Sequence, residues 1–290
     1  MPHTRSSLKN PSNSPLRVSV TASSSIMKWT HTLGSECFAH TDPKSPNDTS
    51  QWEPLFSADC VALDGGDCEA CERLDRGHGH LNKVAWWTAK FVEEMFPGGT
   101  EDANSARQWG YLTGLWHDLG KFAPRWQEYL AKKVGSDIHS DEAIGKVDHS
   151  TAGAQFAERS IAKLGRLIAY LIAGHHPGLT NGEDGEAPQS SLKERMNKTV
   201  AEYESAAPGE VLAYRPTLPF PRFSLCSGQS LAFFLRFLFS CLTDADIKAN
   251  QGESSPIKAK IYDVRQFRRD PGLDPKLQPG DKVEVPQSFS

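Results

Sequence analysis

Several features are scarce in this sequence, and each scarcity excludes a class of protein. No stretch reaches the ~20 consecutive apolar residues that a membrane-spanning helix needs. The most apolar run, residues 231–242, is shorter and contains Arg236, so we interpret it as a core helix. Six cysteines in 290 residues are too few for a disulfide scaffold. We therefore expect a cytoplasmic protein without a membrane segment.

The sequence also lacks a large excess of charge of one sign, and it lacks the phosphate-binding motif of ATP-driven motors. The formal net charge of −4 excludes a surface that is basic throughout, although a local basic groove remains compatible with it. The chain has no G-x-x-x-x-G-K-[ST] loop, so it carries no ATP motor of that type. Its hydrophobic content of 38% is ordinary for a globular protein of a length that can bury a large core.

The two ends of the chain differ in composition from its middle. Residues 1–35 begin with a stretch rich in serine and proline, which predicts a disordered tail, and Met27 is an alternative start of translation. Residues 251–290 are polar and rich in proline, glycine and basic residues, which is typical of a linker. The folded domain is therefore expected over residues 36–250.

Within that domain the apolar residues recur at helical spacing, and the alternation typical of strands is nearly absent. We expect an all-α bundle. Pro124 fits the first position of a helix, and Ser150 or Thr151 fits a helix cap. The helices are expected from Leu81 to the stop at Pro97, over about 103–121, from Pro124, over 150–163 and 164–173, over 189–206 and over 228–249.

A histidine followed directly by an aspartate, His117-Asp118 in L-W-H-D-L-G-K-F, indicates a metal site. Imidazole suits first-row divalent metals, and a carboxylate can bridge two ions. Neighbouring residues on a helix point ~100° apart, so this pair is better suited to flank two ions than to bind one side by side. A single H-D pair also arises by chance, but four further segments rich in histidine or aspartate accompany it: H-G-H-L at 78–81, D-H-S-T at 148–151, G-H-H-P at 174–177 and D-A-D at 244–246.

The ordered series H-L-x-x-V-A, H-D-L-G-K, D-H-S-T-A-G-A, G-H-H-x-G-L and S-C-L-x-D-A-D resembles the HD nuclease domain of the signature nuclease-helicase of type I CRISPR interference systems. The resemblance runs from about Phe38 to Asn250. It implies an HD-domain helical bundle with a dinuclear metal site. The activity it implies is metal-dependent hydrolysis of single-stranded DNA, in endonuclease or exonuclease mode, with an RNA-guided surveillance complex as partner in antiviral defence.

The resemblance also implies the roles of particular residues. Asp118 would be the catalytic bridge between two divalent ions, and Lys121 would place an ammonium near the phosphate, although a lysine at a helix end is often simply solvated. Mn²⁺, Ni²⁺, Co²⁺ or Fe²⁺ suits so many imidazoles better than Mg²⁺ does. The implied ligands of one ion are His80, His117 and either Asp244 or Asp246, and those of the other are His149, His175 and His176.

Some assignments stay open. Asp244 and Asp246 point ~200° apart on a helix, so only one should face the site. His80 is favoured over His78, and Asp148 is expected to orient His149 or the start of its helix. Ordinary loop or structural roles are expected for the remaining histidines, His3, His31, His40 and His139.

Residues 57–77 look like an insertion relative to the family pattern. Cys68 and Cys71 form a C-x-x-C pair there, with Cys60 before them and His78 after them. A structural zinc site is one interpretation, but no second C-x-x-C accompanies the first, and free thiols are the ordinary alternative.

Three functional classes follow: a nuclease, an HD phosphohydrolase of nucleotides or small phosphoesters, and a non-catalytic HD module. The last is disfavoured because every expected ligand type is present. A nuclease would need a groove for the strand, for which Lys193, Arg195, Lys198 and Trp126 are candidates. Since the chain has no motor motif, it is either a nuclease subunit that works with a separate helicase or a frame truncated before one.

Overall fold

The structure is a computed structural model that describes residues 36–64, 66–133, 148–179, 182 and 191–251. The two predicted tails, apart from Gln251, lie outside these residues, as do His3, His31 and His139.

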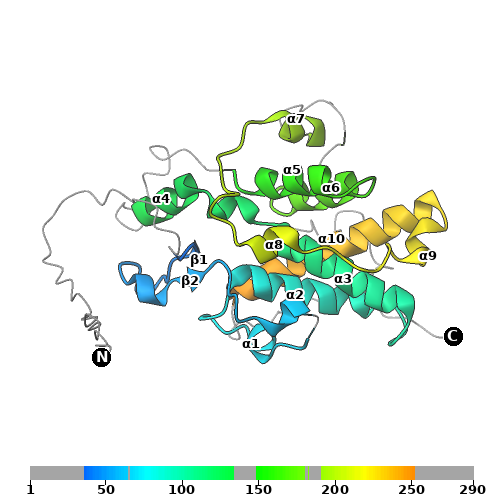
Figure 1. The fold of residues 1–290 in the computed structure, drawn as a ribbon, viewed down its shortest axis with the longest axis horizontal. Coiled ribbons are helices and arrows are strands. Elements are labelled where there is room, and N and C mark those ends of the chain that lie inside the picture. Colours follow the sequence, from blue (N-terminus) through cyan, green and yellow to red (C-terminus); the bar gives the residue numbers. More distant parts are fainter. Residues whose placement is uncertain (1–35, 65, 134–147, 180–181, 183–190, 252–290) are drawn as a thin grey trace, which may run out of the picture. The chain divides into compact units, whose positions relative to one another are not determined.

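Helices make up most of the described chain, and the predicted all-α bundle is confirmed (Figure 1). None of the described helices is long and apolar enough to cross a bilayer. The α-helices are α1 (Glu69–Glu72), α2 (His80–Glu93), α3 (Glu101–Trp116), α4 (Pro124–Lys133), α5 (Ser150–Ser160), α6 (Gly165–Gly174), α7 (Leu192–Asn197), α8 (Gly209–Ala213), α9 (Arg222–Leu225) and α10 (Gly228–Gln251). Short 3-10 helices cover Thr49–Gln51, Val61–Asp64 and Leu119–Phe122.

A small antiparallel sheet precedes the helices. Strand β1 (Phe38–His40) pairs with β2 (Glu53–Pro54), with Phe38 opposite Pro54 and His40 opposite Glu53. The side chain of Gln127 on α4 binds both backbone groups of Phe38, at 3.0 and 2.9 Å. The sheet is thereby fixed to α4.

Helices α2, α3 and α10 pack together as the centre of the bundle. Helices α2 and α3 lie close together at Gly114, where an added Cβ would lie only 2.6 Å from Cα of Ala85. This close approach is what brings His80, at the start of α2, beside His117, which directly follows α3.

Helices α5 and α6 form a pair that packs on the end of α3 (Figure 1). A Cβ at Gly153 of α5 would collide with the carbonyl oxygen of Trp116. Trp116 is fully buried, and its indole Nε1 donates to the carbonyl oxygen of Val211 in α8 over 2.8 Å. Other fully buried side chains of this core are Leu112, Leu115, Leu119, Ile168, Leu171, Ile172, Phe234 and Leu238.

Three local expectations differ from the structure. The helix expected through Lys121 ends at Trp116, because the residues after His117 turn into a 3-10 helix whose Gly120 lies directly against the backbone of His149. The helix expected over 189–206 is only α7, which ends where Lys198 turns to an extended conformation (φ −68°, ψ 144°).

The third difference concerns the cap of α5. Neither Ser150 nor Thr151 caps this helix; the carboxylate of Asp148 accepts from the backbone N–H of Thr151 (3.1 Å) and from its hydroxyl (2.8 Å). Asp148 therefore stabilises the start of α5, which was one of the two roles expected for it; the other was to orient His149.

Replacing Gly114 with Ala should destabilise the bundle. Helix propensity alone would favour alanine by about 1 kcal/mol, but the collision with α2 should cost about 1–3 kcal/mol as overpacking. Chemical denaturation should therefore show a net loss of unfolding free energy. Gly228→Ala is the matched control: it lies in α10, and an added Cβ there meets nothing within 4 Å. Equal stability of the Gly114→Ala variant and the wild type would contradict this packing.

Candidate metal centre

Three helices bring an inner cluster of ligand atoms together. Nε2 of His80 lies 3.4 Å from Oδ1 of Asp246 and 3.7 Å from Oδ2 of Asp118. Nε2 of His117 lies 3.3 Å from that Asp118 oxygen and 3.8 Å from Oδ1 of Asp246. Both histidines are fully buried. The inner cluster thus combines two imidazoles and two carboxylates away from solvent.

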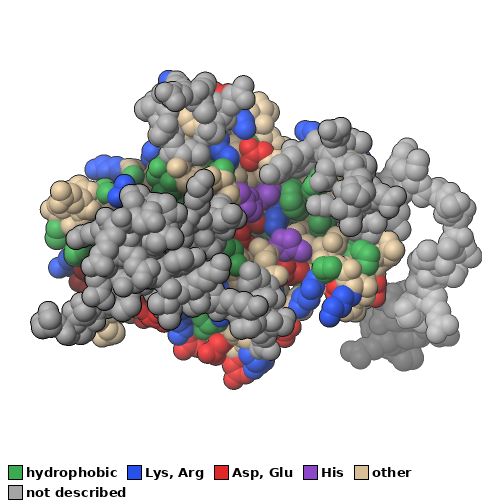
Figure 2. All heavy atoms as spheres, turned by 180° about the vertical axis from the view of Figure 1, so that it is seen from behind, with side chains coloured by type: hydrophobic (Ala, Val, Ile, Leu, Met, Phe, Trp, Pro, Cys, Tyr) green, Lys and Arg blue, Asp and Glu red, His purple; other side chains and the backbone are tan. Residues whose placement is uncertain are grey.

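An outer cluster forms on the other oxygen of Asp118. Oδ1 of Asp118 lies 3.3 Å from Nε2 of His149 and 3.3 Å from Nε2 of His175. Nε2 of His176 lies 2.7 Å from that of His149. His176 is exposed, whereas the other members are buried. Histidine side chains are accordingly visible near the middle of the face drawn in Figure 2.

Asp118 lies between the two clusters because the chain leaves the helix at this residue. Its backbone (φ −118°, ψ 29°) is not helical, and the 3-10 helix Leu119–Phe122 begins after it. Each of its two oxygens therefore faces a different set of imidazoles. The expected separation of His117 and Asp118 is present, but it comes from a break in the helix and not from the 100° step within one.

The residues of both clusters fit divalent metal ions. Among the described residues, the buried Nε2 atoms of His80, His117 and His175 and Oδ1 of Asp118 have no hydrogen-bond partner. Buried polar atoms are normally paired, so these four atoms are suited to bind a cation that the polypeptide itself does not supply.

Two of the imidazoles are held in the orientation that a metal ligand needs. Nδ1 of His117 lies 2.6 Å from the carbonyl oxygen of Gly114, and Nδ1 of His175 lies 2.7 Å from that of Ile172. A carbonyl only accepts, so Nδ1 donates to it, and Nε2 is the ring atom that faces the cluster. Each histidine directly follows its helix, and its side chain reaches back to a carbonyl of the last turn.

The spacing of the ligand atoms also agrees with metal binding. Ligand atoms ~2.1 Å from one ion at angles between octahedral and tetrahedral lie roughly 3.0–3.5 Å apart. The inner donors are 3.3–3.8 Å apart, and the outer ones are 2.7–3.3 Å apart along the contacts above. Movements of a few tenths of an ångström in these side chains would bring the ligand atoms of either cluster to metal-binding distances.

The electrostatics of the centre favour bound positive charge. Burial alone would raise the pKa of Asp118, but His117 and Lys121 hold that pKa well below its usual range. Burial would lower the pKa of His117, but Asp118 and Asp246 raise it to about 10. Without a metal this ring is therefore cationic near pH 7, and a metal ion at Nε2 would take the place of its proton. At the outer end, burial and His175 lower the pKa of His176 to about 3, so this imidazole is neutral near pH 7 and able to bind a metal.

Comparison with known proteins agrees with this geometry. The family model described as Cas3, HD domain, matches residues 80–230, just over half of the chain. The chain belongs to the Cas3 HD-domain family. Membership supports a metal-dependent hydrolase of CRISPR defence that acts on nucleic acid. None of the curated proteins that were compared matches the chain.

The Cas3 HD match ends before the last candidate ligand, so only the fold places it. Asp246 on α10 is 8% exposed and lies against His80 and His117. Asp244, the alternative, is half-buried and belongs to none of the clusters among the described residues. The structure thus brings Asp246 and not Asp244 to the centre.

Lys121 contacts the carboxylate of Asp118 directly. Its Nζ lies 2.8 Å from Oδ2 of Asp118, and the residue is only 3% exposed. Trp126, a groove candidate in the sequence, packs its ring against Lys121 and against the ring of His149, and it is buried. Both residues support the metal cluster and do not form an open surface.

His40 was expected to be an ordinary structural histidine, but in the structure it lies at the metal centre. Its Nε2 lies 3.1 Å from Nζ of Lys121, its Nδ1 lies 2.6 Å from Oε2 of Glu53, and its ring packs edge-on against His80. Burial and Lys121 lower the pKa of His40 to about 4, so it is neutral near pH 7 and accepts from the lysine.

Glu53 is a second residue that sequence reasoning missed. It binds Lys83, which is 1% exposed, over 2.5 Å, and it is itself buried. Its other oxygen holds His40, so the pairing of β1 with β2 determines where His40 points. The only sequence signal was that A-H-T and W-E-P-L lie within the family resemblance.

Two of the three cations predicted to line a groove at α7 contact the start of α5. Arg195 donates to the hydroxyl of Ser150 over 3.1 Å and is half-buried, and Lys198 pairs with Asp148 at 3.3 Å. These two cations thus fix α7 to the start of α5, next to His149. Lys193 is the third member of that cluster and is exposed.

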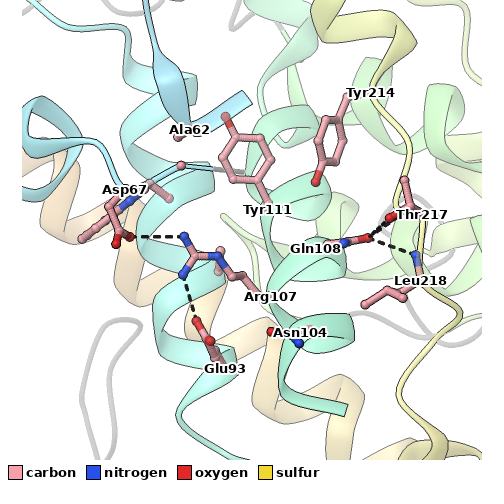
Figure 3. A pocket seen from close by; sticks show the side chains of 13 residues that line it. Ala62, Asp67, Glu93, Asn104, Arg107, Gln108, Tyr111, Tyr214, Thr217 and Leu218 are labelled. Carbon is pink, nitrogen blue, oxygen red and sulfur yellow. Dashed lines mark hydrogen bonds and ion pairs between the residues drawn. The ribbon is translucent and has the colours of Figure 1, made fainter. Parts of the chain in front are cut away.

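A separate pocket lies between α2, α3 and the segment after α8, and none of the candidate ligands lines it (Figure 3). Arg107 binds Glu93 at 3.0 Å and Asp67 at 3.3 Å, and the side-chain oxygen of Gln108 accepts from the backbone of Thr217 and Leu218. Arg107 and Gln108 are thus paired in the pocket wall, whereas the buried hydroxyl of Tyr111 and the indole nitrogen of Trp86 have no hydrogen-bond partner among the described residues.

The two aspartates of α10 can be distinguished by metal binding. Asp246→Ala should weaken metal binding by more than about 100-fold, since even residues behind the ligands are worth 10–100-fold. Asp244→Ala is the matched control and should bind metal like the wild type. Titration calorimetry with Mn²⁺ measures both. Loss of binding in Asp244→Ala with full binding in Asp246→Ala would reverse the assignment.

His40→Ala should weaken metal affinity or activity by about 10–100-fold, because it removes the acceptor that holds Lys121 against Asp118. Lys44→Ala is a control on the same segment, since Lys44 follows the sheet strand in an exposed turn. Mn²⁺ affinity and hydrolysis of a small phosphodiester should be measured together. Wild-type values for both in His40→Ala would show that His40 has no part in the centre.

Proposed function

We propose that this chain is a nuclease that hydrolyses phosphodiester bonds of single-stranded DNA with two divalent transition-metal ions. The ligands would be His80, His117 and Asp246 for one ion and His149, His175 and His176 for the other, with Asp118 shared. The proposal builds on membership of the Cas3 HD family, which supports the coarser activity.

The observation that carries the proposal is the contrast between the two clusters. His80 and His117 are fully buried, whereas His176 is exposed. A substrate can therefore reach the outer end of the centre from solvent while the inner end holds its geometry. Access at the surface suits a long strand, because a small phosphoester would be better enclosed in a pocket.

Ions held at such a pair, ~3.5–4 Å apart, would activate a water on one side of a phosphodiester and stabilise the leaving oxygen on the other. Imidazole-rich ligands favour Mn²⁺, Co²⁺, Ni²⁺ or Fe²⁺ over Mg²⁺. Asp118 would orient the centre, and no protein nucleophile is needed. Lys121 would act through Asp118, since its ammonium is buried against that carboxylate and offsets negative charge there.

The partners follow from the chemistry of the substrate. A stacked duplex cannot lay one strand deeply across a recessed centre, so the strand has to arrive already separated. The chain has no ATP-binding loop of the motor type. We propose that a helicase, together with an RNA-guided surveillance complex, supplies the single strand.

The alternative, hydrolysis of nucleotides or small phosphoesters, predicts a different response to salt. Single-strand binding weakens with a slope of about −0.7 per phosphate contacted, so three contacts would lose roughly 20-fold in affinity between 50 and 200 mM salt. One contact, as with a mononucleotide, would lose about 3-fold. Binding should be measured with Asp118→Asn to prevent cleavage during the titration.

The nuclease proposal also predicts an order of cleavage rates. Single strands should be cut faster than duplex, and mononucleotides should be hydrolysed slowest. Asp118→Ala should abolish all three reactions and lower the metal content from about two ions towards one or none. Faster hydrolysis of mononucleotides than of polymer, together with the shallow salt response, would support the small-phosphoester enzyme.

A further inference from the structure

A second cluster of metal-ligating side chains lies in the segment that precedes α2, and the nuclease proposal does not use it. Sγ of Cys60 lies 3.9 Å from Sγ of Cys68 and 3.6 Å from Sγ of Cys71, and Sγ of Cys68 lies 3.6 Å from Nε2 of His78. All four residues are buried. Their ligand atoms all lie within 4.8 Å of one another.

These distances match the requirements of one tetrahedral ion. With metal–sulfur bonds of ~2.3 Å and metal–nitrogen bonds of ~2.0–2.1 Å, tetrahedral angles place two sulfurs about 3.8 Å apart and a sulfur and a nitrogen about 3.6 Å apart. We propose that Cys60, Cys68, Cys71 and His78 bind one structural zinc ion. Three thiolates and one imidazole that fill all four positions are typical of a structural site and leave no position for a substrate.

Two simpler explanations fit the cluster less well. A disulfide needs sulfurs ~2.05 Å apart, whereas these lie 3.6–3.9 Å apart and are free thiols. Free buried cysteines usually act as small apolar side chains among other apolar groups. Here three thiols meet each other, and one of them meets the ring nitrogen of His78.

The sequence pattern alone, C-x7-C-x2-C-x6-H, has only one of the two C-x-x-C pairs that make a zinc site recognisable. The fold adds Cys60 and His78 to this C-x-x-C pair, which gives four ligands. The chain reaches Cys60 after β2 and turns back through Val61–Asp64, so Cys60 meets the C-x-x-C pair at the start of α1. His78 then closes the cluster directly before α2.

The site would join the inserted segment to the helices that carry the inner ligands. The backbone carbonyl of Cys71 accepts from the indole of Trp87 (3.0 Å), and that of Asp75 accepts from Nζ of Lys83 (3.1 Å). Leu74, which lies between these two carbonyls, belongs to one apolar cluster with Val84 of α2 and with Leu242 of α10.

His78 lies only two residues before His80 in the chain. The ordered turn that His78 would anchor therefore determines where α2 begins and where the first inner ligand points. Zinc binding at this cluster does not depend on the nuclease proposal, and either can fail without the other.

The test measures zinc in the full-length chain after dialysis against metal-free buffer. It uses the Asp118→Ala background, in which the centre has lost its shared ligand and releases weakly held metal on dialysis. About one zinc ion per chain should remain. Adding Cys68→Ser or Cys71→Ser should remove it, whereas adding Cys226→Ser should not, since Cys226 is exposed at the end of α9 and does not belong to the cluster. Zinc retained in Cys68→Ser, or absent from the Asp118→Ala chain, would overturn the proposal.

Cobalt substitution provides a readout that needs no cysteine variant to fold. Co²⁺ in the Asp118→Ala chain should show thiolate-to-cobalt charge-transfer absorption and strong tetrahedral d–d bands, which a site of nitrogen and oxygen ligands does not give. Three cysteines should also gain reactivity towards Ellman's reagent when a chelator is added, beyond those that react in the native chain. Absence of the thiolate band, with thiol reactivity unchanged by the chelator, would overturn the proposal.

Discussion

The carboxylate of Asp118 is the constraint on which the arrangement of the chain depends. One of its oxygens faces the imidazoles of His80 and His117, and the other faces those of His149 and His175. A carboxylate this deeply buried would be neutral on its own, but the surrounding cationic groups keep its pKa well below the usual range. The fold therefore holds a buried negative charge surrounded by imidazole nitrogens, and a divalent cation could replace the protons of these groups.

The packing of the helices determines where these ligand atoms lie. Gly114 lets α2 approach α3, which brings together the two imidazoles of the inner cluster, and Gly153 lets α5 reach the end of α3. The sheet contributes in another way: β2 carries Glu53, which holds His40 against Lys121 and so reaches Asp118. Residues that are not candidate metal ligands thereby determine the orientation of the candidate ligands.

The sequence predicted much of this, but not all of it. Helical spacing and Pro124 located the main helices, because local propensity and burial agree there. The break after His117 was missed, since it arises from Gly120 packing on a distant segment and not from a local stop signal. The choice between Asp244 and Asp246, the part played by His40 and the meeting of Cys60 with the C-x-x-C pair all depend on tertiary contacts that linear spacing does not encode.

The central claim is that Asp118 joins two ions into one centre, and electron paramagnetic resonance of the Mn²⁺-loaded chain tests it most directly. Two Mn²⁺ ions bridged by one carboxylate ~3.5–4 Å apart should be exchange-coupled, with a spectrum that differs from that of isolated Mn²⁺ and reverts towards it in Asp118→Ala. A wild-type spectrum of isolated Mn²⁺ alone, at full metal loading, would contradict the bridged centre.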